Sequence, residues 1–167
     1  MSHNLLFEFT VDKEIKTIVI LREFQASLEL VWKAWTTAPL LDLWCAPNPY
    51  RIETKTMNFK DGGFWHYALV SPSGEKHWSR YDYKKIEINK SITEHRVFSD
   101  EKGAVNPGFS PTECTIVFRN INGRTRVTIT ERYGSEVMFE KMANDSHRKG
   151  FSSHLKNLDR LLSTLKT

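Results

Sequence analysis

SHRKGFSSHLKNLDRLLSTL, residues 146–165, is the stretch that decides the fold. Its apolar residues recur at steps of four and three, which predicts one face of an α-helix. At about 1.5 Å per residue, the helix would be a rod of about 30 Å, long enough to cross a small domain. Such a helix needs an apolar surface to cover. The stripe consists of Phe151, Leu155, Leu158, Leu162 and Leu165, with Asn144, Asp145 and Ser146 as candidate N-caps.

A break in the chain is expected just before this helix. Met138 and Met142 fall nearly opposite the stripe of residues 151–165 when each residue is turned by about 100°. We therefore expect a kink near Asn144 and a short separate helix before it.

Most of the chain before residue 135 is typical of antiparallel strands. Alternating apolar and polar runs are separated by turn signals such as Asn122-Gly123, which favours a two-residue hairpin. The longest irregular stretch, Asp100 to Pro111, is expected to be a mobile loop. Two β-rich runs span residues 5–11 and 15–24, the second being the better strand, and six further strands are predicted at residues 51–58, 64–70, 76–88, 92–99, 113–121 and 124–133.

Two short helices interrupt the strands. An i, i+3, i+4, i+7 apolar pattern after Ser27 predicts an amphipathic helix capped by that serine. A further short helix has Pro39 in its first turn. The predicted order is a strand, two short helices, six more strands and a long terminal helix. A twisted antiparallel sheet whose apolar face is covered by that helix would bury both elements. The apolar pattern consists of Leu28, Val31, Trp32 and Trp35.

Composition narrows the class of protein. The 167 residues fit a single domain that buries about 70% of its unfolded surface. The net charge of +4 comes from interleaved basic and acidic residues, so we expect no nucleic-acid partner. No apolar run approaches membrane-spanning length, so we expect no membrane span. The two cysteines, Cys45 and Cys114, and the lack of an apolar leader favour a reducing cytoplasm.

A family resemblance follows from several motifs. Residues 22–36, REFQASLELVWKAWT, closely resemble the R-x-F-x-A-x-x-E-x-V-W-x-A-W-T opening of proteins similar to the C-terminal domain of the activator of the heat-shock protein 90 ATPase. These proteins belong to the SRPBCC (START and birch-pollen-allergen-like) superfamily. The resemblance spans residues 7–165. Further matches are Trp44 with Pro47, the pair Gly62-Gly63, and the terminal pattern Gly150, Phe151, Leu155, Leu158, Leu161 and Leu162.

The resemblance implies an α+β helix-grip fold. In this fold a curved antiparallel sheet wraps around the long C-terminal helix, with two short helices after the first strand and a cavity between sheet and helix. Two departures bear on this chain. Gln25-Ala26-Ser27 stands where many relatives have Asp-Ala-Pro, and Cys45 stands where many have a second tryptophan. The cysteine would reshape one end of the cavity.

Aromatic residues are the candidates for lining that cavity. Trp65, Tyr67 and Leu69 share one face of a predicted strand, and the family pattern turns that face toward the helix. Apolar rings with a few polar tips suit a flat, hydrophobic, aromatic or lipid-like molecule. For any single ring, the alternative is that it only fills the core. The candidate ligand-binding residues are Trp35, Trp44, Trp65, Tyr67, Trp78, His95, Phe118, Met142 and Phe151.

No motif predicts a catalytic residue, a metal or a cofactor. His147 and His154 are seven residues apart, too far along a helix for the i, i+4 chelation of zinc proteases. The carboxylates Asp82, Glu94 and Glu131 lie on separate predicted strands, so no acid/base pair is expected. Cys45 has no predicted base beside it, and a buried inert thiol is the commoner case.

The leading hypothesis is binding of a hydrophobic small molecule for sequestration, sensing or transfer. Entry would lie between the Asp100 to Pro111 loop and the Met138 to Ala143 segment. The resemblance also implies an alternative, a co-chaperone-like interaction with heat-shock protein 90 in the stress response, although the chaperone-gripping N-terminal domain is expected to be absent. A further alternative is an enzyme of unassigned reaction in the same cavity. A homodimer is left open.

Overall fold

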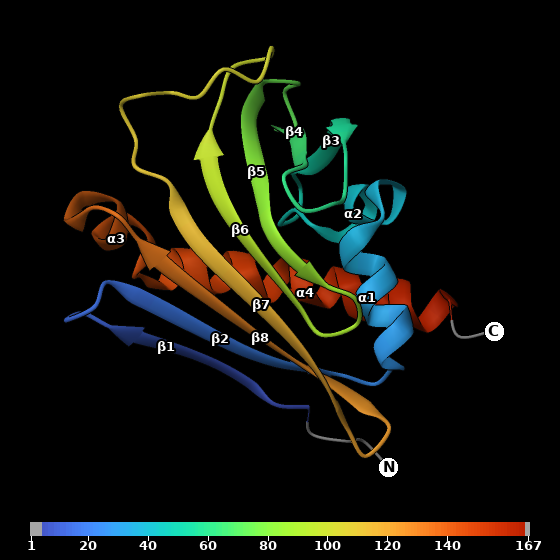
Figure 1. Ribbon diagram of the computed structural model, residues 1–167. Helices are drawn as coiled ribbons and strands as arrows, with labels where there is room; N and C mark the ends of the chain where they lie inside the picture. The colour runs from blue at the N-terminus through green and yellow to red at the C-terminus, as the bar shows by residue number, and fades with distance from the viewer. Residues whose placement is uncertain (1–4, 166–167) are drawn as a thin grey trace.

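The computed structural model describes residues 5–165, in which eight strands form one antiparallel sheet that curves around a long helix (Figure 1). The order across the sheet is β1-β2-β8-β7-β6-β5-β4-β3, so the first two strands pair beside the last one. This arrangement confirms the predicted α+β helix-grip fold. The strands are β1 (Phe7–Asp12), β2 (Thr17–Phe24), β3 (Arg51–Met57), β4 (Phe64–Val70), β5 (Lys76–Glu87), β6 (Ser91–Phe98), β7 (Thr112–Ile121) and β8 (Arg124–Tyr133).

The two N-terminal runs form two separate strands. Residues 13–16 make a turn in which Lys16 has a φ of 49°, and β1 folds back on β2 so that Phe7 lies opposite Arg22. Both short helices therefore follow the second strand, whereas the predicted order placed them after the first. The turn residues Asp12-Lys13-Glu14 carried the signal for this reversal.

The two short helices, α1 (Leu28–Thr36) and α2 (Ala38–Trp44), fill one end of the curved sheet. Ser27 caps α1 as predicted, because its hydroxyl accepts from the backbone N–H of Leu30 at 3.3 Å. Pro39 lies in the first turn of α2, also as predicted. Helix α2 packs against β3 and the terminal helix, and the indole N–H of Trp44 donates to the carbonyl of Ala34 at 3.0 Å. This packing brings two tryptophans, Trp35 and Trp44, into the interior.

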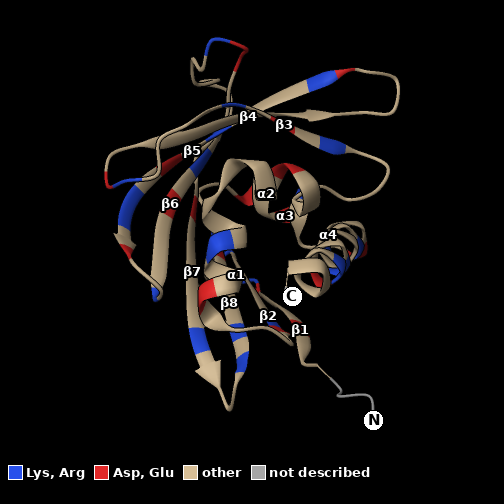
Figure 2. Cartoon of the chain, turned by 90° about the vertical axis from the view of Figure 1, so that its right-hand side faces the viewer, with Lys and Arg blue, Asp and Glu red and all other residues tan. Residues whose placement is uncertain are grey.

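The terminal helix α4 (Asp145–Leu165) lies across the concave face of the sheet (Figures 1 and 2). Its buried residues are four of the five predicted ones, at 151, 155, 158 and 162, whereas Leu165 in the last turn is only half-buried. A short helix, α3 (Glu136–Met142), precedes it, and the break falls at Asn144, as predicted. The side chain of Arg22 on β2 donates to Asp159 on the partly exposed side of α4. Helix and sheet are thus held by an apolar stripe with an ion pair beside it.

Asn144 caps α4, and its loss should have a measurable cost. The Asn144 side-chain oxygen accepts from the backbone N–H of His147 at 2.9 Å. We expect Asn144→Ala to lower the free energy of unfolding by about 1 kcal/mol, because the N–H loses its acceptor. Urea unfolding measures the change. Ser146→Ala, in the first turn of the same helix, is the control and should stay within about 0.5 kcal/mol of the wild type. Equal losses in both variants would argue against the cap.

Residues 99–111, which connect β6 to β7, arch over one end of the sheet (Figure 1). The carboxylate of Asp100 accepts from the backbone N–H groups of Lys102 and Ala104, at 2.9 Å each. The carbonyl of Asp100 also meets Nε2 of His66 on β4 at 2.9 Å. The first half of the connection is therefore tied to the sheet.

The charged residues spread over both layers of the protein. Lysine, arginine and acidic residues occur together on the strands and on α4 (Figure 2). Within residues 5–165, none of the helices has the length and hydropathy needed to cross a membrane.

Candidate ligand-binding cavity

A cavity lies between the concave face of the sheet and the helices α3 and α4. It has two adjoining parts. The sheet-side chamber, of ≈ 310 Å³, is lined mainly by β4 to β8 and α3. The helix-side chamber, of ≈ 630 Å³, extends to α1, α2 and α4. The two chambers adjoin because several residues line both, among them Tyr67, Tyr81, Arg96, Glu131 and Met142.

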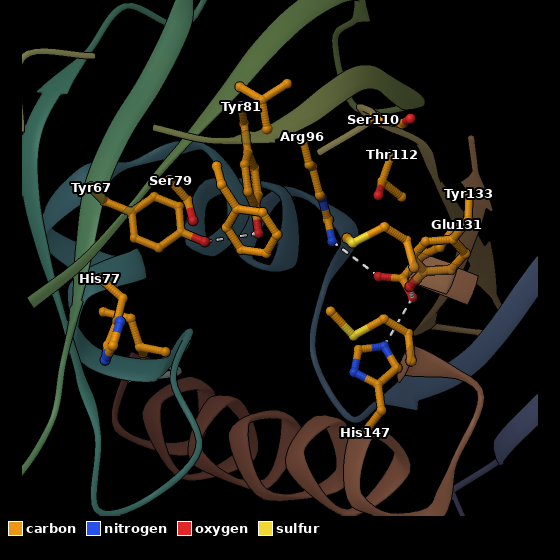
Figure 3. Close-up of a pocket in the computed structure, with 15 residues that line it drawn as sticks. Tyr67, His77, Ser79, Tyr81, Arg96, Ser110, Thr112, Glu131, Tyr133 and His147 are labelled. Carbon is orange, nitrogen blue, oxygen red and sulfur yellow. Dashed lines mark hydrogen bonds and ion pairs between the residues drawn. The ribbon is translucent and has the colours of Figure 1, made fainter. Parts of the chain in front are cut away.

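A cluster of charged and polar side chains stands on the cavity wall (Figure 3). The Arg96 guanidinium donates through Nε to Glu94 at 2.7 Å and through Nη1 to Glu131 at 3.1 Å. Glu131 also accepts from the hydroxyl of Tyr133 at 2.9 Å and lies 3.1 Å from Nε2 of His147 on α4. We call these five residues the Arg96 cluster. It ties three elements of the fold together at the junction of the two chambers.

The strand register explains why the Arg96 cluster can form. Glu94 on β6 lies opposite Cys114 on β7, which lies opposite Glu131 on β8, so the three side chains stand in one row. In the next row Arg96 lies opposite Thr112. Because Cys114 and Thr112 are small, the Arg96 side chain can cross the middle strand and reach Glu131.

Burial and charge act differently on the two carboxylates. Burial raises the pKa of Glu94, and the nearby Arg96 only partly offsets it. Burial also acts to raise the pKa of Glu131, but the hydrogen bond from His147 and the charge of Arg96 outweigh it, so the pKa is lowered. Glu131 is therefore a fixed negative charge facing the cavity at neutral pH.

Two tyrosines face each other on the neighbouring strands β4 and β5, beside Arg96 (Figure 3). The hydroxyl of Tyr67 donates to the hydroxyl of Tyr81 at 3.1 Å, and the Tyr81 ring lies 4.4 Å from the guanidinium carbon of Arg96. Burial raises the pKa of Tyr67 to about 12 and that of Tyr81 well above its usual value. Both phenols therefore keep their protons at neutral pH.

His154 on α4 belongs to the helix-side chamber. Its ring stacks on Trp44 with 5.9 Å between centroids and an interplanar angle of 17°. Its buried Nδ1 atom has no hydrogen-bond partner within residues 5–165. Burial, together with the charges of Arg96 and His147, lowers the pKa of His154 to about 3. The chamber is thus bordered by a neutral imidazole.

Five of the nine predicted ligand-binding residues line the cavity. They are Trp35, Trp44, Tyr67, Met142 and Phe151. Trp65 lies behind Tyr67, with the two rings stacked at 4.2 Å, and its indole N–H donates to the hydroxyl of Thr54 at 3.0 Å. Phe118 packs against Trp35 at 5.5 Å within the core. These last two residues support the wall without forming its surface.

The other two predicted residues lie outside the cavity. Trp78 lines a shallower hollow at the rim, together with Phe98 and Phe109. His95 faces the outer side of the sheet, 3.8 Å from Glu113, because it alternates along β6 with the inward-facing Glu94 and Arg96. The structure therefore brings Arg96, rather than its neighbour His95, to the cavity.

Sequence reasoning did not select the polar residues of the cavity wall. Glu94 and Glu131 do stand on separate strands, as predicted, but Arg96 joins them. The available signal was strand alternation, since Glu94 and Arg96 share the parity of the buried Ile92. Further polar residues of the wall without a predicted ligand role include Tyr81, Tyr133, Lys141, His147 and His154.

The cysteines and acidic groups offer little chemistry of other kinds. Cys45 lines the helix-side chamber, and burial raises its pKa to about 12, so its thiol is protonated and unreactive. Cys114 is buried and unpaired. In the described part of the chain, no group of three His, Cys, Asp or Glu side chains is placed to hold a metal ion.

The cavity opens at an apolar rim between α3 and residues 99–111. The rim hollow shares His77, Phe98, Met138 and Met142 with the sheet-side chamber, so the two are continuous. Several exposed large apolar side chains gather around this end; they are Phe98, Val105, Phe109 and Val137. An apolar molecule would meet apolar surface before it reached the chambers.

The curved sheet, the long helix and the cavity between them define a helix-grip protein of the SRPBCC class. The family model described as "Activator of Hsp90 ATPase homolog 1-like protein" matches residues 25–163, and the chain belongs to this family. This finding confirms the resemblance seen in the motifs.

Solved structures from several bacteria share the fold of this chain. A protein from Mycobacterium smegmatis is 22% identical with a TM-score of 0.84, and the match covers 95% of this chain and 96% of that one. A protein from Arthrobacter aurescens is 27% identical with a TM-score of 0.86, covering 94% and 91%. One from Staphylococcus epidermidis is 23% identical with a TM-score of 0.84, covering 95% and 96%. None of the curated proteins matches this chain.

Proposed function

We propose that the protein binds a mostly apolar small molecule in the cavity between the sheet and α4, in order to sequester, sense or transfer it. The observation that carries the proposal is the cavity itself, with chambers of ≈ 310 and ≈ 630 Å³. Protein interiors are normally packed without voids of this size, and small-molecule pockets have volumes of about 300–1,000 Å³. The aromatic walls supply flat apolar contacts.

Entry would follow the rim between α3 and residues 99–111. Met138 and Met142 line both the rim hollow and the sheet-side chamber. Methionine side chains are flexible and adapt to irregular apolar surfaces, which suits a passage. The chaperone interaction, an enzymatic reaction, a homodimer and a cytoplasmic location stay predictions.

Filling the junction of the two chambers should prevent binding. Leu69 lines both chambers, so an indole in its place would occupy space that the ligand needs. We expect Leu69→Trp to weaken binding of the neutral fluorescent probe N-phenyl-1-naphthylamine by at least about tenfold, or about 1.4 kcal/mol. The measurement is the rise in probe fluorescence on titration with protein.

Leu43→Trp is the matched control because Leu43 is 65% exposed on α2 and lines neither chamber. It should bind the probe as the wild type does. Far-UV circular dichroism and urea unfolding establish that both variants are folded. Equal probe affinity in folded Leu69→Trp and wild-type protein would remove the cavity as the binding site.

A further inference from the structure

We propose that the ligand carries a polar group that is not an anion, namely a hydroxyl or an ammonium group that donates a hydrogen bond to the Arg96 cluster. This inference rests on the proposed binding function and narrows its ligand class. It excludes carboxylates, such as free fatty acids or aromatic acids, as preferred ligands.

The balance of charge in the Arg96 cluster carries the argument. Arg96 is a cation on the wall of both chambers, but its Nε group already donates to Glu94 and its Nη1 group to Glu131, the second contact being drawn in Figure 3. Two carboxylates thus face one guanidinium. At the Arg96 cluster a ligand carboxylate would find no unneutralised cation and would stand beside Glu131 in a partly dehydrated site. Lys141 also lines the helix-side chamber, but it is exposed on α3, where water and salt screen its charge. Repulsion between like charges is screened less there than in water.

Hydrogen-bonding capacity points to the same class of ligand. A carboxylate has about four acceptor positions. Tyr133, His147 and Arg96 occupy three of those on Glu131, which leaves room for one more donor.

Tyr81, on the strand beside Arg96, can satisfy the acceptor side of a hydroxyl. It receives the hydrogen bond of Tyr67, and among the hydrogen bonds of residues 5–165 none uses the Tyr81 proton. A ligand hydroxyl at the cluster could therefore donate to Glu131, and Tyr81 offers an unused donor on the same wall. An ammonium group would use the Glu131 side alone.

The neighbouring histidine does not change the balance. His154 borders the helix-side chamber beside Trp44, where burial keeps its imidazole neutral. It adds no positive charge that could attract an anion. The remaining wall around the chambers is mainly aromatic and aliphatic, and would hold the apolar body of the ligand.

The test uses three probes that share one apolar body and differ in their polar group. They are 2-naphthalenemethanol, 2-naphthoate and 2-naphthylmethylamine, which is an ammonium ion at pH 7.5. Each is titrated into wild-type protein by isothermal titration calorimetry. We expect the alcohol or the amine to bind at least about tenfold more tightly than the carboxylate. The ratio between alcohol and amine identifies which donor the cluster prefers.

The outcomes separate this inference from the proposed function. Carboxylate affinity equal to or greater than that of the other two probes overturns the inference and leaves the binding function intact. Failure of all three probes and of N-phenyl-1-naphthylamine to bind overturns both. The wild-type series decides the question without any variant.

A matched pair of variants assigns the preference to one carboxylate. Glu131→Gln keeps the shape of the side chain and removes its charge, so the preference for alcohol over carboxylate should fall by about tenfold. Glu113→Gln is the control, because Glu113 lies on the outer face beside His95 with its side chain 50% exposed. An unchanged preference in folded Glu131→Gln would contradict the role given to Glu131.

Discussion

Replacing Leu158 with alanine is expected to lower the free energy of unfolding by about 2–5 kcal/mol. Leu158 is fully buried in the middle of α4 and belongs to the main apolar core. Truncation removes its apolar surface from the contact between helix and sheet and leaves a space that the surrounding strands cannot close. Equilibrium urea unfolding followed by tryptophan fluorescence measures the loss.

The control for this prediction lies on the same helix. Leu161 is three residues further along α4 and only partly buried. Leu161→Ala should cost distinctly less, because part of its side chain already meets water. Comparable losses at the two positions would mean that the 151–162 stripe is not what attaches α4 to the sheet.

The elements of the fold could be predicted because their signals are local. The helical spacing of Phe151, Leu155 and Leu158 fixed the buried face of α4 without any tertiary knowledge. Asn122-Gly123 predicted the β7–β8 hairpin, and the two residues have φ values of 53° and 86°, as such a two-residue turn requires. The predicted order did not count β1 as a separate strand, because its run is the weaker of the two N-terminal strand signals, although the turn between them marked the reversal.

The candidate site was harder to predict because it depends on register. Strand alternation, helical spacing and the family pattern were enough to predict that Tyr67 and Phe151 face the cavity. The Arg96 cluster depends on Glu94, Cys114 and Glu131 forming one row across three strands. A shift of one residue in either pairing would turn one carboxylate to the outer face. No local pattern fixes that register.

The Arg96 cluster also leads to a prediction about stability. Arg96→Met should lower the free energy of unfolding at pH 7.5 by about 3–5 kcal/mol, because it leaves two buried carboxylates without their cation. The side chains of Glu94 and Glu131 are only 3% and 4% exposed, so water cannot replace the guanidinium. Methionine retains much of the apolar stem, which limits the loss from packing alone. Urea unfolding of variant and wild type provides the comparison.

The dependence on pH distinguishes lost charge compensation from lost packing. In the wild type the lowered pKa of Glu131 adds stability above its unfolded pKa of about 4.3, and this contribution is lost as the pH falls. Without Arg96, burial raises the pKa of Glu94 further above its unfolded value, and the pKa of Glu131 also rises because one of the charges that offset its burial is lost. The variant therefore has a lower free energy of unfolding at pH 7.5, and it regains stability as the carboxyl groups take up protons toward pH 5. The difference in free energy of unfolding between wild type and variant should therefore shrink as the pH falls from 7.5 to 5. It should shrink by about 1.4 kcal/mol for each unit by which the loss of Arg96 raises a carboxyl pKa.

Arg80→Met is the matched control for this effect. Arg80 pairs with Asp82 at 2.7 Å, but the two side chains are 25% and 26% exposed and lie outside the Arg96 cluster. A more accessible pair should contribute about 1 kcal/mol or less to the free energy of unfolding. The stability that Arg80→Met loses should not be regained at low pH to the same extent. If Arg96→Met shows the same deficit at pH 5 and pH 7.5, the guanidinium acts by filling space rather than by neutralising Glu94 and Glu131. The charge balance on which the ligand preference depends would then be wrong as well.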